Sequence, residues 1–335
     1  MSSSKPNISP IWLVVIAVLL WSTGGLFIKL TTLDAYQVTF FRSLLAGITV
    51  IIATRKNGLR INFFGFVCSL IYAILLFLFV WATKHTTAAN AIFLQYTAPI
   101  YILILSPFVI GEKFHFRDLA TVIVCIAGMS LFFVGKLEIS DYQGNIAALG
   151  SGIFLGLYIM LLRHPKATRL PANAASSQGS PPYEAGAPAA ASASGVDVGG
   201  VAAASADGVV LSERIRQPSI NPVITVIYGN FMLALVTLPS GIAAIPSLTF
   251  TDIFAVSFLG IVQIGISYIL FIKGVSGGTR PLDASIIGFI EPLLNPVWVF
   301  LFVGEQPSNW AVLGGIIIIA TVVIHTLVQY RLRNT

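Results

Sequence analysis

Several polar side chains of this 335-residue chain lie deep within long apolar runs, where their types and spacing suit the binding of a polar solute. Glu291 and Asn295 are four residues apart, so a helix would place both on one face. Glu291 could bind a cationic group or a coupling proton, or it could fix the backbone at a break caused by Pro292, and we favour the functional interpretation. Gln263 and Ser267 have the same spacing in another run. We predict that these polar side chains contact a solute.

Two larger side chains, Arg42 and Trp21, also lie within apolar runs. Arg42 is eight residues beyond Asp34, which places it about 12 Å into a helix. It could hold a carboxylate or pair with Glu291, but it could also snorkel or bond to carbonyls at a helix end, and we favour a structural role. Trp21 is positioned to stack on a ring or a cation. Trp81 lies near the end of its run and is more typical of an anchor at a membrane interface.

Prolines interrupt two of the runs, at Pro99 and Pro292. A proline removes one backbone donor and leaves an earlier carbonyl without its partner, and such a carbonyl can face a cavity. We therefore expect the runs at 88–110 and 282–303 to lie beside the path of a solute. The further candidates for contact with that solute are polar residues of the same and a neighbouring run: Asn90, Gln95, Tyr96 and Tyr158.

The chain contains an internal repeat. A proline, a glycine and a glutamate return in the same order 193 residues later, so that Pro99, Gly111 and Glu112 correspond to Pro292, Gly304 and Glu305. On the same offset Asn90 corresponds to Asp283, which we interpret as a helix cap. Membrane transporters are often built from such repeats, with the substrate site between them.

The composition requires a lipid environment. Hydrophobic residues make up 56% of the chain and charged residues only 10%, against about 25% charged residues in an ordinary soluble domain. A run of about 20 apolar residues can cross the bilayer as a helix. The fold class we predict is an all-α integral membrane protein with ten transmembrane helices, near residues 11–31, 35–54, 61–83, 88–110, 118–135, 143–162, 222–244, 250–272, 282–303 and 309–330.

One connection differs from the others. Residues 164–219 include a stretch rich in Ala, Ser, Gly and Pro, which cannot bury enough apolar surface to order itself, so we expect a disordered loop. It divides the chain into residues 1–163, holding five spans of a first repeat and the first span of a second, and residues 220–335, holding the other four spans and a tail. Small-residue spacing, such as Gly152 and Gly156, fits either a homodimer contact or packing within a monomer.

The distribution of basic residues predicts the orientation. Alternate connections, counted from the N-terminus, hold 15 lysines and arginines, and the other connections hold 3. Basic residues are retained on the cytoplasmic side, so both termini and the long loop should be cytoplasmic. Because each repeat has five spans, the second must enter the membrane inverted. Glu112 would then face the cytoplasm and Glu305 the exterior, which indicates a structural or gating role for both.

Four segments carry a resemblance to a known family: Trp21-Ser22-Thr23; Phe41-Arg42-Ser43-Leu44-Leu45-Ala46; Gln95-Tyr96-Thr97-Ala98-Pro99 leading to Gly111-Glu112-Lys113; and Glu291-Pro292 leading to Gly304-Glu305. With ten predicted helices they resemble the EamA-type branch of the drug/metabolite transporter superfamily. The resemblance covers about residues 11–163 and 220–328. It implies an exporter of amino acids or other small metabolites in the plasma membrane, which in bacteria is the inner membrane.

These patterns favour a secondary transporter or facilitator that works by alternating access, with a small metabolite and the lipid bilayer as partners and a proton as a possible coupling ion. Nucleobases, sugars or organic cations are alternative substrates, and a membrane scaffold or sensor without transport is an alternative function. The basic residues are not clustered with aromatics as in a nucleic-acid surface. No nucleophile–base pair, metal-ligand spacing or phosphate loop is present in the sequence, so we expect no enzyme, no cofactor and no metal.

Overall fold

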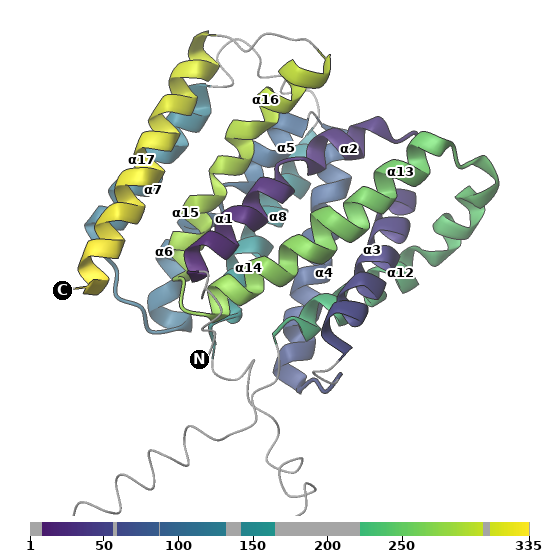
Figure 1. Cartoon of the computed structure of the whole chain (residues 1–335), viewed down its shortest axis with the longest axis horizontal. Coiled ribbons are helices and arrows are strands. Elements are labelled where there is room, and N and C mark those ends of the chain that lie inside the picture. The colour runs from purple at the N-terminus through teal and green to yellow at the C-terminus, as the bar shows by residue number, and fades with distance from the viewer. Residues whose placement is uncertain are drawn as a thin grey trace, which may run out of the picture.

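The protein is helical throughout the part of the chain that the computed structural model describes, namely residues 9–55, 59–86, 88–131, 142–164, 222–303 and 309–334 (Figure 1). No β-strand occurs within these ranges. The loop predicted to be disordered, residues 164–219, lies outside the described residues except for His164. Glu305 also lies outside them.

The helices of the first part of the chain are α1 (Pro10–Trp21), α2 (Gly24–Leu30), α3 (Ala35–Thr54), α4 (Phe63–His85), α5 (Ala88–Gln95), α6 (Ala98–Val109), α7 (Phe116–Ser130) and α8 (Tyr142–Leu161). Those that follow the long loop are α12 (Ile224–Ala244), the 3₁₀ turn η3 (Ile245–Ser247), α13 (Phe250–Phe258), the π-helical segment η4 (Leu259–Ile266), α14 (Ser267–Ser276), α15 (Pro281–Gly288), α16 (Ile290–Val303) and α17 (Asn309–Asn334).

Short polar residues start several of these helices. At the start of α3, Asp34 accepts a hydrogen bond from the Gln37 amide, and the Gln37 side chain accepts one from the Asp34 amide. This capping box satisfies two backbone donors that the first helical turn leaves unpaired. Thr249 and Asp252 form the same arrangement before α13. These two helices therefore begin where the sequence supplies a cap.

Eight helical stretches, two of which contain a short turn, are long and apolar enough to cross a membrane. They coincide with eight of the ten predicted spans: Pro10–Leu30, Ala35–Thr54, Phe63–His85, Asn90–Val109, Tyr142–Leu161, Ile224–Ser247, Phe250–Ser276 and Val312–Gln329. The run at 118–135 forms α7, which has only 15 residues, and the run at 282–303 is divided into α15 and α16. Ten crossings therefore stay a prediction.

The repeat is visible in the helix boundaries. Helix α5 covers residues 88–95 and helix α15 covers 281–288, which is an offset of 193 residues at both ends. Helices α7 and α17 begin at Phe116 and Asn309, again 193 residues apart. Since helix boundaries depend on local sequence and packing together, their repetition extends the duplication from sequence to structure.

Packing partners follow the same relation. Helix α3 packs against α12, and α7 packs against α17 at one edge of the bundle (Figure 1). Helix α1 packs against α14, and α4 packs against α8. In the repeat α1 corresponds to α8, and α4 corresponds to the span that contains α14, so the second pair is the repeat counterpart of the first. Among the broken helices, α15 contacts α6 and α16 contacts α5. The two broken segments therefore run antiparallel, which is the arrangement that an inverted repeat would need.

Close helix contacts depend on glycine at a few positions. A Cβ atom added to Gly152 of α8 would lie 2.7 Å from the Gln95 carbonyl oxygen at the end of α5. The glycine pair at 152 and 156 therefore serves packing within the chain, which was one of the two interpretations of its spacing. Cys68 and Cys125 are fully buried and form no disulfide.

Candidate functional site

A small internal cavity lies where α1, α3, α5, η4 and α16 meet. Its lining combines charged, polar and aromatic side chains with four aliphatic or aromatic apolar ones: Trp21, Arg42, Gln95, Tyr96, Gln263, Tyr268 and Glu291, with Leu76, Phe79, Leu155 and Ile264. The space open to the centres of water molecules is about 30 Å³, and a water needs roughly 10–15 Å³ on this measure, so the cavity has room for about two waters.

Interruptions of the helical backbone supply much of this lining. Trp21 is the last residue of α1, Tyr96 lies between α5 and α6, and Glu291 is the second residue of α16. Gln263 lies within the π-helical segment η4. Irregular backbone at membrane depth is tolerated where it borders a cavity, and π-helical turns occur often at functional sites. The pattern indicates that the helices are broken in order to line the cavity.

The two predicted proline breaks are present. Pro99 lies in the first turn of α6, after the break at Tyr96, and Pro292 lies in the first turn of α16, after the break at Phe289. Tyr96 and Phe289 are themselves 193 residues apart. A proline is accepted in a first turn because its missing N–H has no partner there anyway.

A hydrogen bond joins the two broken segments across the cavity. The Tyr96 hydroxyl donates to Glu291 Oε2 at 2.7 Å, and both side chains are buried. A Cβ atom added to Gly288 would lie 2.8 Å from Tyr96 Cε1, so the absence of a side chain there lets the phenol reach Glu291. This contact holds the Glu291 carboxylate at a fixed place in the lining, and it links the two repeats.

The other polar lining residues are also held in place. Gln95 Nε2 donates to Ser151 Oγ at 2.6 Å. The ring of Trp21 packs against Tyr268 and Phe271, with ring centroids 4.7 and 4.6 Å apart. Rigid support of this kind preorganises a binding site, because little side-chain freedom remains to be lost when a ligand binds.

The structure gathers five of the nine predicted contact residues into this lining, together with Arg42, for which the sequence favoured a structural role, and places others elsewhere. Tyr158 is fully buried beside it, where its hydroxyl is 2.9 Å from Thr225 Oγ1. Asn90 donates to Thr86 Oγ1 at the far end of α5. Ser267 donates to the backbone carbonyl of Gln263 in its own helix, so its hydroxyl does not line the cavity. The side chain of Asn295 lies outside the described residues.

Tyr268 lines the cavity but was not predicted from the sequence. The reason is the π-helical segment, whose backbone hydrogen bonds join residues five apart rather than four, so that the side chains after it are turned around the helix axis relative to an α-helix. Gln263 is therefore followed on the cavity face by Tyr268, whereas the ordinary helical spacing indicated Ser267. Nothing in the sequence alone marks residues 259–266 as π-helical.

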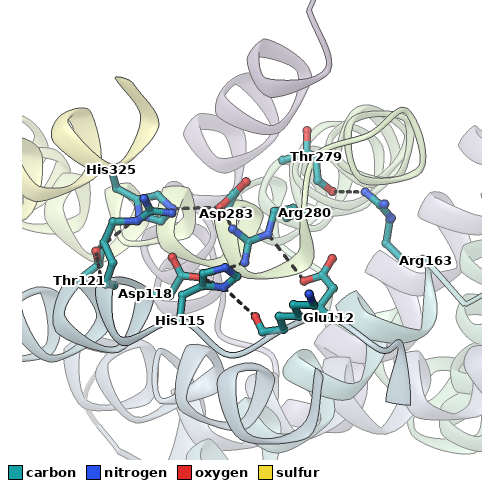
Figure 2. Close-up of polar contacts among 11 residues, drawn as sticks. Glu112, His115, Asp118, Thr121, Arg163, Thr279, Arg280, Asp283 and His325 are labelled. Carbon is teal, nitrogen blue, oxygen red and sulfur yellow. Dashed lines mark hydrogen bonds and ion pairs between the residues drawn. The ribbon is translucent and has the colours of Figure 1, made fainter. Parts of the chain in front are cut away.

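A second group of charged residues, here called the Arg280 cluster, lies at the turn between α14 and α15 (Figure 2). Arg280 Nη2 donates to Asp118 Oδ2 at 2.9 Å. The guanidinium also lies 3.7 Å from Glu112 and 3.8 Å from Asp283. Burial by itself would lower the pKa of Arg280, but these carboxylates outweigh it and the pKa lies above its ordinary value. One arginine thus joins the start of α7 and the connection before it to the start of α15.

Two neighbours extend the Arg280 cluster. His325 Nε2 of α17 lies 3.0 Å from Asp283 Oδ1, and both residues are buried (Figure 2). Arg163, after α8, donates to the Thr279 carbonyl at 3.1 Å. Asp283, which we had interpreted as a helix cap, and Glu112, a predicted gating residue, are therefore parts of one network. The pairing of Asp283 with His325 was not predicted, because no sequence pattern relates the two positions.

The opposite end of the bundle carries a different polar group. Helix α1 begins close to the Arg280 turn, because a Cβ atom added to Gly277 would lie 3.5 Å from the Pro10 ring. Helix α2, which continues α1, ends at the opposite end of the bundle (Figure 1). There Lys29 Nζ donates to the Thr86 carbonyl and Lys84 Nζ to the Thr31 carbonyl, each at 3.0 Å. Polar contacts therefore hold the helices together at both ends of the cavity.

Within the described residues, no group of three or more His, Cys, Asp and Glu side chains could hold a metal ion. The lining itself contains one carboxylate, one guanidinium, two amides, an indole and two phenols. Such a set can bind a polar solute through hydrogen bonds and charge, with the aromatic faces available for apolar or cationic groups.

Fold and site together define a multi-pass, all-helical membrane protein with a polar cavity between two repeated halves. A sequence model of the EamA-like transporter family matches residues 8–134 and 198–327. The chain therefore belongs to the EamA-like transporter family, as its motifs had indicated. A search of curated proteins finds no match.

The fold also has solved relatives. One crystal structure superposes with a TM-score of 0.67 over 96% of this chain and 98% of its own, at 18% sequence identity. At that identity the likeness extends to the fold alone. The two matches to one family model, one in each half of the chain, agree with the repeat found in the helix boundaries.

Proposed function

We propose that the protein is a secondary transporter or facilitator that moves a small organic metabolite, with amino acids as the leading class, by alternating access. The observation that carries the proposal is the central cavity, whose polar lining comes from broken helices of both repeats. A polar cavity inside an apolar bundle has a high cost in desolvation, which a purely structural protein has no reason to bear. Membership of the EamA-like transporter family also supports a transport function.

Alternating access requires that each end of the cavity can open and close. Room for about two waters is too little for a metabolite, so the helices must separate before a solute can bind. The Arg280 cluster joins α7 and α15 at one end, and the lysine contacts of α2 and α4 join helices at the other. We assign these two polar groups to the gates. Glu112 belongs to the first gate, and we retain Glu305 as its repeat counterpart.

We base the orientation on the charge distribution, and the direction of transport on the resemblance to exporters. With basic residues retained inside, the termini and the Arg280 cluster face the cytoplasm. An inverted repeat would put the cavity near the middle of the bilayer. We propose export across the plasma membrane, with Glu291 as the residue that would carry a coupling proton.

The alternatives differ in what they need from the cavity. A purely cationic solute would suit Glu291, but Arg42 lines the same cavity and would repel it. A nucleobase or a sugar would use the amides and aromatic rings and leave both charges without a partner. A scaffold or sensor without transport would need neither a polar lining nor openings.

The proposal is tested by thermal shift with the purified protein against amino acids, amines, nucleobases and sugars. A solute that binds only the folded state raises the melting temperature in proportion to RT ln(1 + [L]/Kd). For the solute that gives a shift, Glu291→Gln should weaken binding at least tenfold, since it removes a charge in the lining. Ser267→Ala is the matched control, because that hydroxyl bonds to its own helix, and it should leave the affinity unchanged. Equal effects of both variants would count against the cavity as the binding site.

A further inference from the structure

Five polar atoms around the central cavity are buried and have no hydrogen-bond partner within the described part of the chain. Four are donors, namely Nε, Nη1 and Nη2 of Arg42 and Nε1 of Trp21, and the fifth is an acceptor, Oε1 of Gln263. Arg42 is 0% exposed, and all three residues line the cavity. Buried donors and acceptors are almost always paired in native proteins, so a group of five at one site points to a partner that is supplied from outside the chain.

The Arg42 guanidinium is the strongest of these signals. In the described structure no carboxylate lies within 4.0 Å of it, although Glu291 lines the same cavity. Glu291 is instead held by the Tyr96 hydroxyl. A buried charge without a counter-charge is costly unless another ion arrives to neutralise it. Arg42 is therefore better explained as a binding residue than by the structural role that its sequence context favoured.

The chemistry of the unpaired atoms defines the missing group. A guanidinium presents its donors as a planar fork that matches a carboxylate, and the indole N–H is a donor only. Two other groups of the same lining, Gln263 Oε1 and the Glu291 carboxylate, accept hydrogen bonds and favour positive charge. The apolar part of the lining is provided by Leu76, Phe79, Leu155 and Ile264.

We propose that the transported solute carries a carboxylate bound by Arg42 and the Trp21 indole N–H, and an amino group that faces Gln263 and Glu291. The inference rests on the transport function proposed above and narrows its substrate to zwitterionic amino acids. Sugars, nucleobases and simple amines lack the anionic group, so they would leave the buried guanidinium without a counter-charge.

The test uses matched ligands with the full-length protein in detergent. Leucine, phenylalanine and threonine are each compared with their C-terminal amide and with the corresponding decarboxylated amine. At least one amino acid should bind, and its amide and amine should bind at least a hundredfold more weakly, because a site built around a hydrogen-bonded group rejects an analogue that lacks it.

Two substitutions localise the carboxylate. Trp21→Phe keeps an aromatic ring, although a smaller one, and removes the N–H, and it should weaken binding of the amino acid about tenfold or more. Arg42→Lys keeps the charge but not the fork and should weaken it further. Trp298→Phe is the matched control, because Trp298 Nε1 already donates to Ser22 Oγ outside the lining, and it should leave the affinity unchanged. If Arg42→Lys does not fold, Trp21→Phe and its control still decide the question.

The outcomes separate this inference from the proposed function. An amide or amine that binds as tightly as its amino acid overturns the carboxylate assignment, and so does a Trp21→Phe variant with unchanged affinity. Binding and transport of a sugar, nucleobase or amine, with none of the three amino acids bound, overturns the inference but leaves a transporter. If no solute is bound or moved at all, the proposed function itself fails.

Discussion

The Arg280 cluster allows a quantitative prediction about gating. Arg280 Nη2 lies 2.9 Å from Asp118 Oδ2, the Asp118 side chain is 1% exposed, and its other oxygen has no hydrogen-bond partner among the described residues. Arg280→Gln would leave this carboxylate buried without its cation. Breaking a buried pair in this way typically costs about 3–5 kcal/mol. Since Arg280 itself is 21% exposed, we expect a value near the lower end, about 3 kcal/mol.

This loss affects the state in which the cluster is closed. If the contact exists only when that end of the cavity is shut, about 3 kcal/mol shifts the equilibrium towards the open state roughly a hundredfold, because 1.4 kcal/mol corresponds to a factor of ten. The shift towards the open state is measured as the labelling rate of a cysteine introduced by Ser106→Cys. Ser106 is a buried residue of α6 that borders the space beside the Arg280 cluster. Cys68 and Cys125 are first replaced by alanine, and labelling uses a membrane-impermeant maleimide applied from the side of the cluster.

We expect Arg280→Gln to increase the labelling rate of Ser106→Cys by one to two orders of magnitude. Lys113→Gln is the control, because it removes an equal charge from an exposed position in the same connection, and exposed charges contribute about 1 kcal/mol or less. Adding Asp118→Asn to Arg280→Gln removes the uncompensated carboxylate and should reverse part of the increase. An unchanged rate in Arg280→Gln, or an equal rise in Lys113→Gln, would refute the gate.

Three further substitutions test the packing and hydrogen bonds around the site. Tyr96→Phe removes the hydroxyl that donates to Glu291 and should lower the free energy of unfolding by about 1.5–3 kcal/mol, measured by thermal melting; a melting temperature equal to the parent's would show that the bond contributes nothing. Gly152→Ala places a methyl group 2.7 Å from the Gln95 carbonyl and should lower the melting temperature through about 1–3 kcal/mol of overpacking, with no change of oligomeric state by light scattering; dissociation of a dimer would contradict packing within the chain. Asp252→Asn weakens the contacts to Thr32 and the α13 cap and should cost about 1–2 kcal/mol in the same melting assay; an unchanged melting temperature would argue against it.

The sequence predicted the broad organisation because each part of it depends on local composition. Long apolar runs indicate helices, and eight of these helices are long and apolar enough to span a membrane. Pro99 and Pro292 predicted the two breaks, since a proline removes a backbone donor from a helix interior but is accepted in the first turn of a new helix. The breaks in turn brought Gln95, Tyr96 and Glu291 into the list of candidates. These inferences needed no knowledge of which helices touch.

Three features could not be predicted because they depend on contacts between distant segments or on the exact backbone. The π-helical segment moved the cavity face from Ser267 to Tyr268. The hydrogen bond between Asp283 and His325 joins two residues that are 42 positions apart in the sequence and lie on different helices. Arg42 looked structural in the sequence, because only the assembled bundle leaves its guanidinium without a partner.

The most direct test of the account is solute flux through the purified protein alone. The protein is reconstituted into sealed vesicles preloaded with radiolabelled amino acids, one at a time, and efflux is followed with empty vesicles and the Glu291→Gln variant as controls. We predict rapid efflux of at least one amino acid, strongly reduced in Glu291→Gln. Efflux equal to that of empty vesicles for every amino acid, and for an amine, a nucleobase and a sugar as well, would contradict the claim that the cavity carries solutes across the membrane.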